Sequence, residues 1–130
     1  MKSFYIVVLV AMILCSCTKN ADETITTFKG VALISSTNEP VTEGNIAIIG
    51  YEDTSFIGPD RQTFSSATST NADGTFNVQV TTSANVDYLV IQVQIPGGFS
   101  TTVCNPISCS GIKPGKDYSD LTLYATFLAD

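Results

Sequence analysis

The chain has 130 residues, with 6 basic and 12 acidic side chains and no histidine. The acidic excess opposes nonspecific binding to nucleic acid, so no nucleic-acid partner is expected. The lack of histidine excludes Ser-His-Asp and Cys-His catalysis and most zinc sites, because histidine is the usual general base near neutral pH and the commonest metal ligand. We therefore expect a protein that is not an enzyme and has no metal or cofactor.

The first segment in chain order is short and basic, Met1-Lys2-Ser3, and eleven apolar residues (FYIVVLVAMIL) follow it over residues 4–14. A run of this length fits the hydrophobic part of a signal peptide, whereas a helix that spans a bilayer needs about 20 apolar residues. We expect residues 1–16 to be a helical signal peptide. The alternatives are an uncleaved anchor and a plain secretory signal cut near Ser16 or Ala21.

The segment Leu14-Cys15-Ser16-Cys17 resembles the lipobox of bacterial lipoproteins, with small Ser16 directly before the cysteine to be modified. The resemblance implies diacylglyceryl transfer to the sulfur of Cys17, cleavage before Cys17 and acylation of the new amine. Each buried acyl methylene contributes about 0.8 kcal/mol, and two or more chains together anchor a protein stably. Thr18, rather than Asp, is compatible with delivery to the outer membrane. The membrane is therefore an expected partner, and the protein would face the periplasm or the cell surface.

Residues 17–24 show no periodicity and are expected to be a flexible tether. The domain over residues 25–130 alternates between short strands and turns. Strands are expected over residues 28–34, 45–51, 63–70, 75–81, 87–95, 99–103 and 121–128. Two of these segments alternate cleanly, and their expected core residues are Phe76, Val78, Val80, Leu89, Ile91, Val93 and Ile95. About seven such strands predict an all-β fold, a single antiparallel β-sandwich, with the polar segment 63–70 at an edge.

Between the third and fourth strands lies Asn71-Ala72-Asp73-Gly74, which has two interpretations. Clustered oxygens suggest a calcium loop, but the rest of a calcium ligand set is missing. A hairpin turn is favoured, because Asn and Asp bond to their own backbone and Gly accepts a positive φ.

Several of these residues resemble the carboxypeptidase regulatory-like, transthyretin-like β-sandwich family. They are Gly30, the Pro40-Val41 pair with Gly44 behind it, and the run from Thr70 to Phe76 (TNADGTF). The match covers about residues 28–80. Gly44 lies one residue late, and the Pro-Gly-Tyr loop of the family is replaced by residues 83–88 (SANVDY). The resemblance implies a sandwich that serves as a noncatalytic accessory or binding module.

Near the C-terminus, Cys104 and Cys109 flank four residues, Asn-Pro-Ile-Ser. An exported protein meets an oxidising compartment, so a structural disulfide is expected, with free thiols as the alternative. Closing so short a loop stabilises by roughly 2 kcal/mol in the chain-entropy model. A redox site would favour Cys-x-x-Cys, and a metal site would need further ligands.

Three loops carry the remaining contact candidates. Phe56 and Ile57 lie in the loop over residues 52–62, where two adjacent apolar residues either pack into the core or contact a partner. The same loop holds Glu52-Asp53 and Asp60, which we read as a solvated acidic loop rather than a glycosidase pair. Tyr118 lies in a polar loop over residues 111–120. A sugar-stacking platform could also draw on Tyr51, Tyr88, Tyr118 and Tyr124, although packing on the sheets is the default interpretation.

The expected function is a lipid-anchored cell-envelope β-sandwich that binds or scaffolds without catalysis, with a cell-envelope protein or a glycan as partner. The alternative is a structural or adhesive subunit that assembles through edge strands such as residues 63–70. A small carboxylate-based hydrolase ranks third.

Overall fold

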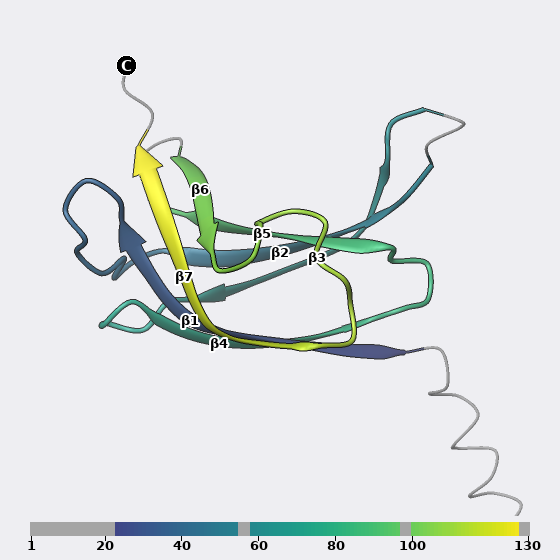
Figure 1. Cartoon of the computed structure of the whole chain (residues 1–130), viewed down its shortest axis with the longest axis horizontal. Coiled ribbons are helices and arrows are strands. Elements are labelled where there is room, and N and C mark those ends of the chain that lie inside the picture. The colour runs from purple at the N-terminus through teal and green to yellow at the C-terminus, as the bar shows by residue number, and fades with distance from the viewer. Residues whose placement is uncertain (1–22, 55–57, 97–99, 128–130) are drawn as a thin grey trace, which may run out of the picture.

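The computed structural model describes residues 23–54, 58–96 and 100–127, and this part of the chain is all-β. Its strands are β1 (Thr24–Ile34), β2 (Asn45–Glu52), β3 (Arg61–Ser69), β4 (Thr75–Thr82), β5 (Tyr88–Gln94), β6 (Ser100–Asn105) and β7 (Asp117–Phe127). They form two sheets (Figure 1), a four-stranded one in the order β4-β1-β7-β6 and a three-stranded one in the order β3-β2-β5. The expected all-β fold with seven strands in two sheets is confirmed.

The four-stranded sheet is mixed, which corrects the expectation of two antiparallel sheets. β1 and β7 run parallel, side by side, whereas every other neighbouring pair is antiparallel. Alternation of apolar and polar residues shows which side chains face the core but carries no information on strand direction. The first and last strands are far apart in sequence, so no short turn forces them to run in opposite directions.

Both β1 and β7 are longer than expected, because residues 24–26 of β1 pair with β4 and residues 117–118 of β7 pair with β1. β1 begins at Thr24, the last residue assigned to the tether, and β7 begins at Asp117 rather than at residue 121. A register shift lies between Phe28 and Gly30, opposite Asp120, whose φ is 57 degrees. The bulge interrupts the alternation of residues 117–120, which is why these residues resemble a loop in the sequence.

The core lies between the sheets and is formed by alternate residues of each strand. Its fully buried members include Phe28, Ile46, Ile48, Leu89, Ile91 and Leu123. All seven expected core residues face this core: the six in β4 and β5 are buried, and Ile95, directly after β5, is partly buried against them. The expected interior of both segments is therefore confirmed.

The turn between β3 and β4 joins the two sheets and is not a hairpin, because β3 and β4 lie in different sheets. Its local chemistry is as expected. The backbone N–H of Thr75 and its hydroxyl both donate to Asp73 Oδ1, and Gly74 has a φ of 82 degrees. These bonds hold the pKa of Asp73 below its usual range. The Asp73 carboxylate therefore accepts hydrogen bonds within the turn that contains it. Among the described residues, no group of three or more His, Cys, Asp or Glu is placed to hold a metal.

Candidate binding surface on the three-stranded sheet

The side of the three-stranded sheet that faces away from the core is its outer face. The outward side chains of β3, β2 and β5 form three columns, one for each strand, and the strand register aligns them in rows across the sheet. In the order β3, β2, β5, the rows are Gln62, Tyr51 and Tyr88, then Ser65, Ile49 and Val90, then Ala67, Ala47 and Gln92, and last Ser69, Asn45 and Gln94. One end of this face is aromatic, its middle carries small side chains, and its other end carries amides and hydroxyls.

The aromatic end is a stacked pair of tyrosines contributed by two paired strands. Tyr51 of β2 and Tyr88 of β5 are register partners, and their ring centroids lie 5.3 Å apart with an interplanar angle of 15 degrees. The Tyr88 hydroxyl donates a 2.5 Å hydrogen bond to Asp60 Oδ2. That bond, helped by burial and by the negative charge of Asp60, raises the pKa of Tyr88 to about 12. The pair is therefore positioned by the pairing of β2 with β5 and by the hydrogen bond from Tyr88 to Asp60 of the acidic loop.

The carboxylates of the loop beyond this pair make contacts that organise the loop. Glu52 accepts a 2.6 Å ion-pair bond from Arg61 across the β2–β3 pair. Asp60 also accepts the backbone N–H of Thr54, and Asp87 accepts that of Asp53. These contacts organise the acidic loop at the rim of the outer face.

Removing the Asp60 carboxylate should let Tyr88 ionise at a lower pH. In a spectrophotometric titration of tyrosinate, one phenol of the wild-type chain should titrate near pH 12, and Asp60→Ala should return it toward 10, the ordinary value. A raised phenol pKa means that its contribution to stability is complete below pH 10 and is lost as the pH rises through about 12. Tyr88→Phe, as control, should delete the late step. A wild-type curve in which all phenols titrate together would contradict the Tyr88–Asp60 bond.

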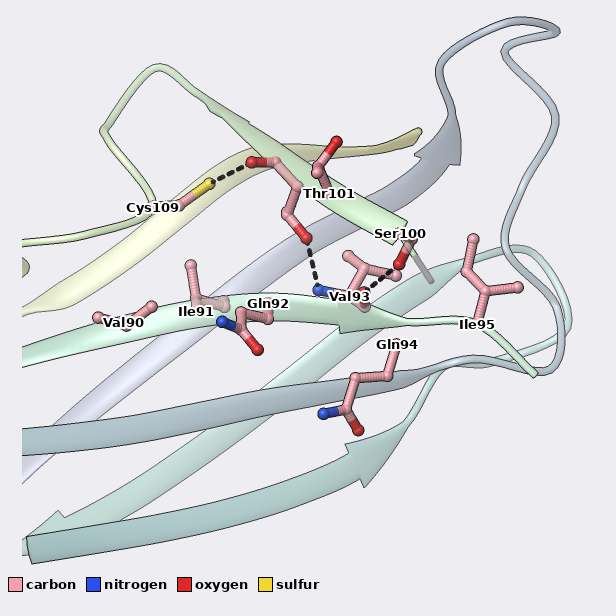
Figure 2. A pocket seen from close by; sticks show the side chains of 10 residues that line it. Val90, Ile91, Gln92, Val93, Gln94, Ile95, Ser100, Thr101 and Cys109 are labelled. Atoms are coloured by element: carbon pink, nitrogen blue, oxygen red, sulfur yellow. Dashed lines mark hydrogen bonds between the residues drawn. The ribbon is translucent and has the colours of Figure 1, made fainter. Parts of the chain in front are cut away.

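A groove of about 590 Å³ borders the outer face along the edge of β5 that is not paired with β2. Its lining includes Val90, Gln92 and Gln94 from β5 and residues 100–102 of β6. Figure 2 shows Gln92 and Gln94 projecting on the same side of β5, away from the hydrogen bonds that join β5 to β6. The groove and the outer face therefore share their polar side chains.

The edge of β5 is covered by β6 and by the chain between β6 and β7. The backbone N–H of Val93 donates to Thr102 Oγ1 at 3.0 Å, and Ser100 Oγ donates to the Val93 carbonyl at 3.1 Å (Figure 2). The N–H of Ile91 donates to the Cys109 carbonyl at 2.9 Å. Leu89 and Ile112 exchange two backbone bonds of 2.7 and 3.0 Å. Because its outward N–H groups are satisfied, this edge offers no template for another strand.

The disulfide predicted from the sequence is confirmed. Cys104, near the end of β6, is bonded to Cys109, with Cα atoms 5.2 Å apart. The bridge holds the carbonyl of Cys109 beside β5, where it accepts the N–H of Ile91. It is therefore a structural link in the segment that covers the β5 edge.

The other predicted contact residues either fall outside the described part of the chain or, in the case of Tyr118, lie on the four-stranded sheet. Phe56, Ile57 and Cys17 are outside the described residues. Tyr118 belongs to β7, where its half-buried ring stacks on Phe28 with centroids 5.4 Å apart and its hydroxyl donates to the Lys113 carbonyl. It also lines a small depression of about 210 Å³ with Lys113 and Lys116. Tyr124 is also in β7, so the four tyrosines do not form one platform, and only Tyr51 and Tyr88 meet.

Sequence reasoning missed the residues between and beyond the tyrosines, above all Ile49, Val90, Gln92 and Gln94. One signal was present, because residues 45–51 (NIAIIGY) lack the polar alternation of a strand with one face in water. The half-buried Ile49 shows why: β2 is the central strand, and its outward side chains are flanked by neighbours on both sides.

Large exposed apolar side chains are found on the other sheet. Ile25, Val103 and Phe127 are 54%, 59% and 49% exposed and lie on β1, β6 and β7. The two sheets thus present chemically different surfaces. No helix in the described part of the chain has the length and apolar character needed to span a bilayer.

Comparison with known proteins does not assign this chain to a family, because no family model, no curated protein and no solved structure matches it.

Proposed function

We propose that this protein is a lipid-anchored lipoprotein of the outer membrane whose β-sandwich binds an envelope ligand without catalysis. The observation that carries the binding role is the outer face of the three-stranded sheet, which holds a fixed aromatic pair at one end and exposed amides and hydroxyls toward the other. Rigid strands hold these side chains in fixed rows, which lowers the ordering cost that a ligand must overcome. The resemblance to the carboxypeptidase regulatory-like family, a proposal in its own right, agrees with a binding role.

The anchor would keep this face close to the membrane. β1 starts at Thr24, at the same end of the long axis as the β2–β3 and β4–β5 connections (Figure 1). Seven residues separate Thr24 from the end of the proposed signal peptide. An extended chain spans at most about 3.5 Å per residue, so such a tether would reach roughly 25 Å. The aromatic end of the outer face would then lie on the membrane side and the amide end farther out.

Mass spectrometry of the mature N-terminus tests the anchor. Protein purified from membranes should begin at a triacylated or diacylated Cys17, and Cys17→Ser should leave the protein unprocessed at that site and unacylated. Ser16 and the strands remain intact in this variant, so its fold should not change. An unacylated wild-type chain that begins anywhere else would refute the lipoprotein proposal.

Hydroxyl-radical footprinting on intact cells tests the binding role even while the ligand is unidentified. Labelling of Tyr51, Tyr88 and Val90 should be several-fold lower in cells than in the purified full chain in detergent micelles. Val103 and Tyr124 on the opposite sheet provide the internal control. Equal labelling of both sheets in both samples would show that the outer face carries no ligand in the cell.

Assembly through an edge strand is a second candidate, and the position of β3 favours it. β3 pairs only with β2, and it is polar, as expected from the sequence. An exposed edge of this kind can accept a strand from a neighbour. Association in analytical ultracentrifugation that disappears in Ser66→Pro would support this function, and a monomer at all concentrations would exclude it.

A further inference from the structure

The side chains beyond the tyrosine pair combine hydrogen-bonding groups with small apolar ones. Gln92 and Gln94 are exposed, and within the described residues their amides make no hydrogen bond. Asn45 accepts a bond from the Ser69 hydroxyl at 3.4 Å, which orients this corner of the face. Each amide supplies both a donor and an acceptor, so it can pair with a hydroxyl in either direction.

The shape of the face suits an extended ligand. Tyr51 lies six positions after Asn45 along β2, which corresponds to about 20 Å of strand, and three strands give a width of roughly 10 Å. Ala47 and Ala67 lie side by side in the middle of the face. Their short side chains form a lower band between the tyrosine pair and the end of the face that carries Asn45 and Gln94. The groove along β5 extends this surface beyond the edge of the sheet.

The charge of the face favours an uncharged ligand. None of the residues in its rows is charged, whereas Glu52 and Asp60 lie at the aromatic end. The chain as a whole has a net charge of −6. An anionic polymer would approach this surface against an unfavourable potential, and a neutral one would not.

A protein partner fits this face less well than the opposite sheet. Cores of protein interfaces are enriched in large apolar and aromatic anchors. Among the described residues, the exposed large apolar side chains are Ile25, Val103 and Phe127, and all three lie on the four-stranded sheet. On the outer face, Ala47 is only 5% exposed and the tyrosines, Ile49 and Val90 are half-buried. Apart from Ala67, the exposed side chains there carry amides or hydroxyls.

We infer that the ligand of the outer face is a neutral oligosaccharide, lying along β2 and β5 from the Tyr51–Tyr88 pair to Gln94. Sugar C–H groups pack against the tyrosines and the methyl groups of the lower band, and sugar hydroxyls pair with the amides of Gln92 and Gln94. This inference rests on the proposed binding function and adds the ligand class to it.

The test uses the full-length chain in micelles of a detergent without a sugar headgroup. Binding is measured by calorimetry against deproteinised envelope polysaccharide, separated by ion exchange into neutral and anionic fractions and cut into oligosaccharides. The neutral fraction should bind. Gln92→Ala with Gln94→Ala should weaken binding about tenfold, the effect of losing two ordinary hydrogen bonds. Tyr51→Ala should weaken it comparably.

The matched control is Asn77→Ala with Gln79→Ala, which removes two exposed amides from β4 on the opposite sheet and should leave binding unchanged. Binding of the anionic fraction alone, binding of neither fraction, or neutral binding insensitive to the outer-face variants would overturn the inference. If footprinting on cells still shows protection of the outer face, that result separates a wrong ligand class from a failure of the proposed function. Protection that protease abolishes and glycosidases leave intact would assign the face to a protein.

Discussion

Gly30→Ala is expected to destabilise the fold by about 3 kcal/mol, at the upper end of the usual cost of overpacking. A Cβ at residue 30 would lie 2.0 Å from the Leu121 carbonyl oxygen and 2.7 Å from its carbon. These are backbone atoms of the neighbouring parallel strand, so relief requires β1 and β7 to separate. Urea unfolding followed by circular dichroism measures the loss, which should also appear as a fall of roughly 12–24 °C in melting temperature.

Gly111→Ala is the control for the loss of a glycine without the clash. Nothing lies within 4 Å of a Cβ at residue 111, but its φ of 69 degrees is left-handed. The cost there should be only about 1–2 kcal/mol, because an L residue with a side chain disfavours this conformation. Equal losses in the two variants would contradict the close approach of β1 and β7 at the bulge.

Replacing both cysteines, Cys104→Ser with Cys109→Ser, is expected to cost about 2 kcal/mol from loop closure alone. The bridge closes the loop that begins where β6 ends, and the carbonyl of Cys109 covers the N–H of Ile91. Without the bridge, this part of the β5 edge should open more often. Urea unfolding measures the stability, and amide hydrogen exchange should show faster exchange at Ile91 than in the wild-type chain.

Reduction of the wild-type chain should reproduce both effects of the cysteine variant, since it breaks the same bond. Exchange at Phe76 on β4, far from the loop in the strand order, should change only as much as global stability does. Unchanged stability after reduction, or unchanged exchange at Ile91, would contradict the role of the bridge in covering β5.

The sequence was sufficient to predict the strands whose side chains alternate, and the physical reason is local. In β4 and β5 every second residue is apolar, so both the extent and the inward face could be read directly. Strand direction and sheet membership depend on contacts far apart in sequence. The parallel β1–β7 pair and the crossing between sheets after Thr70 therefore could not be predicted, and the bulge at Asp120 hid the start of β7.

The candidate site was predicted only in part. The Cys104–Cys109 disulfide followed from short spacing, and Tyr51 and Tyr88 were among the four tyrosines considered. Their meeting depends on the β2–β5 register, which the sequence does not encode locally. The same register places Gln92 and Gln94 beside Ala47 and Asn45, so the binding surface exists only once the strands have paired.

The location of the ligand can be measured most directly by an amide NMR titration of the full-length chain in micelles with the neutral oligosaccharide fraction. Saturable shift changes should be confined to β2, β3 and β5, with the largest at Tyr51, Tyr88, Gln92 and Gln94. The amides of β1 and β7 should stay unchanged. Saturable changes centred on Val103 and Tyr124 would place binding on the opposite sheet and contradict the assignment of the outer face of the three-stranded sheet as the binding surface.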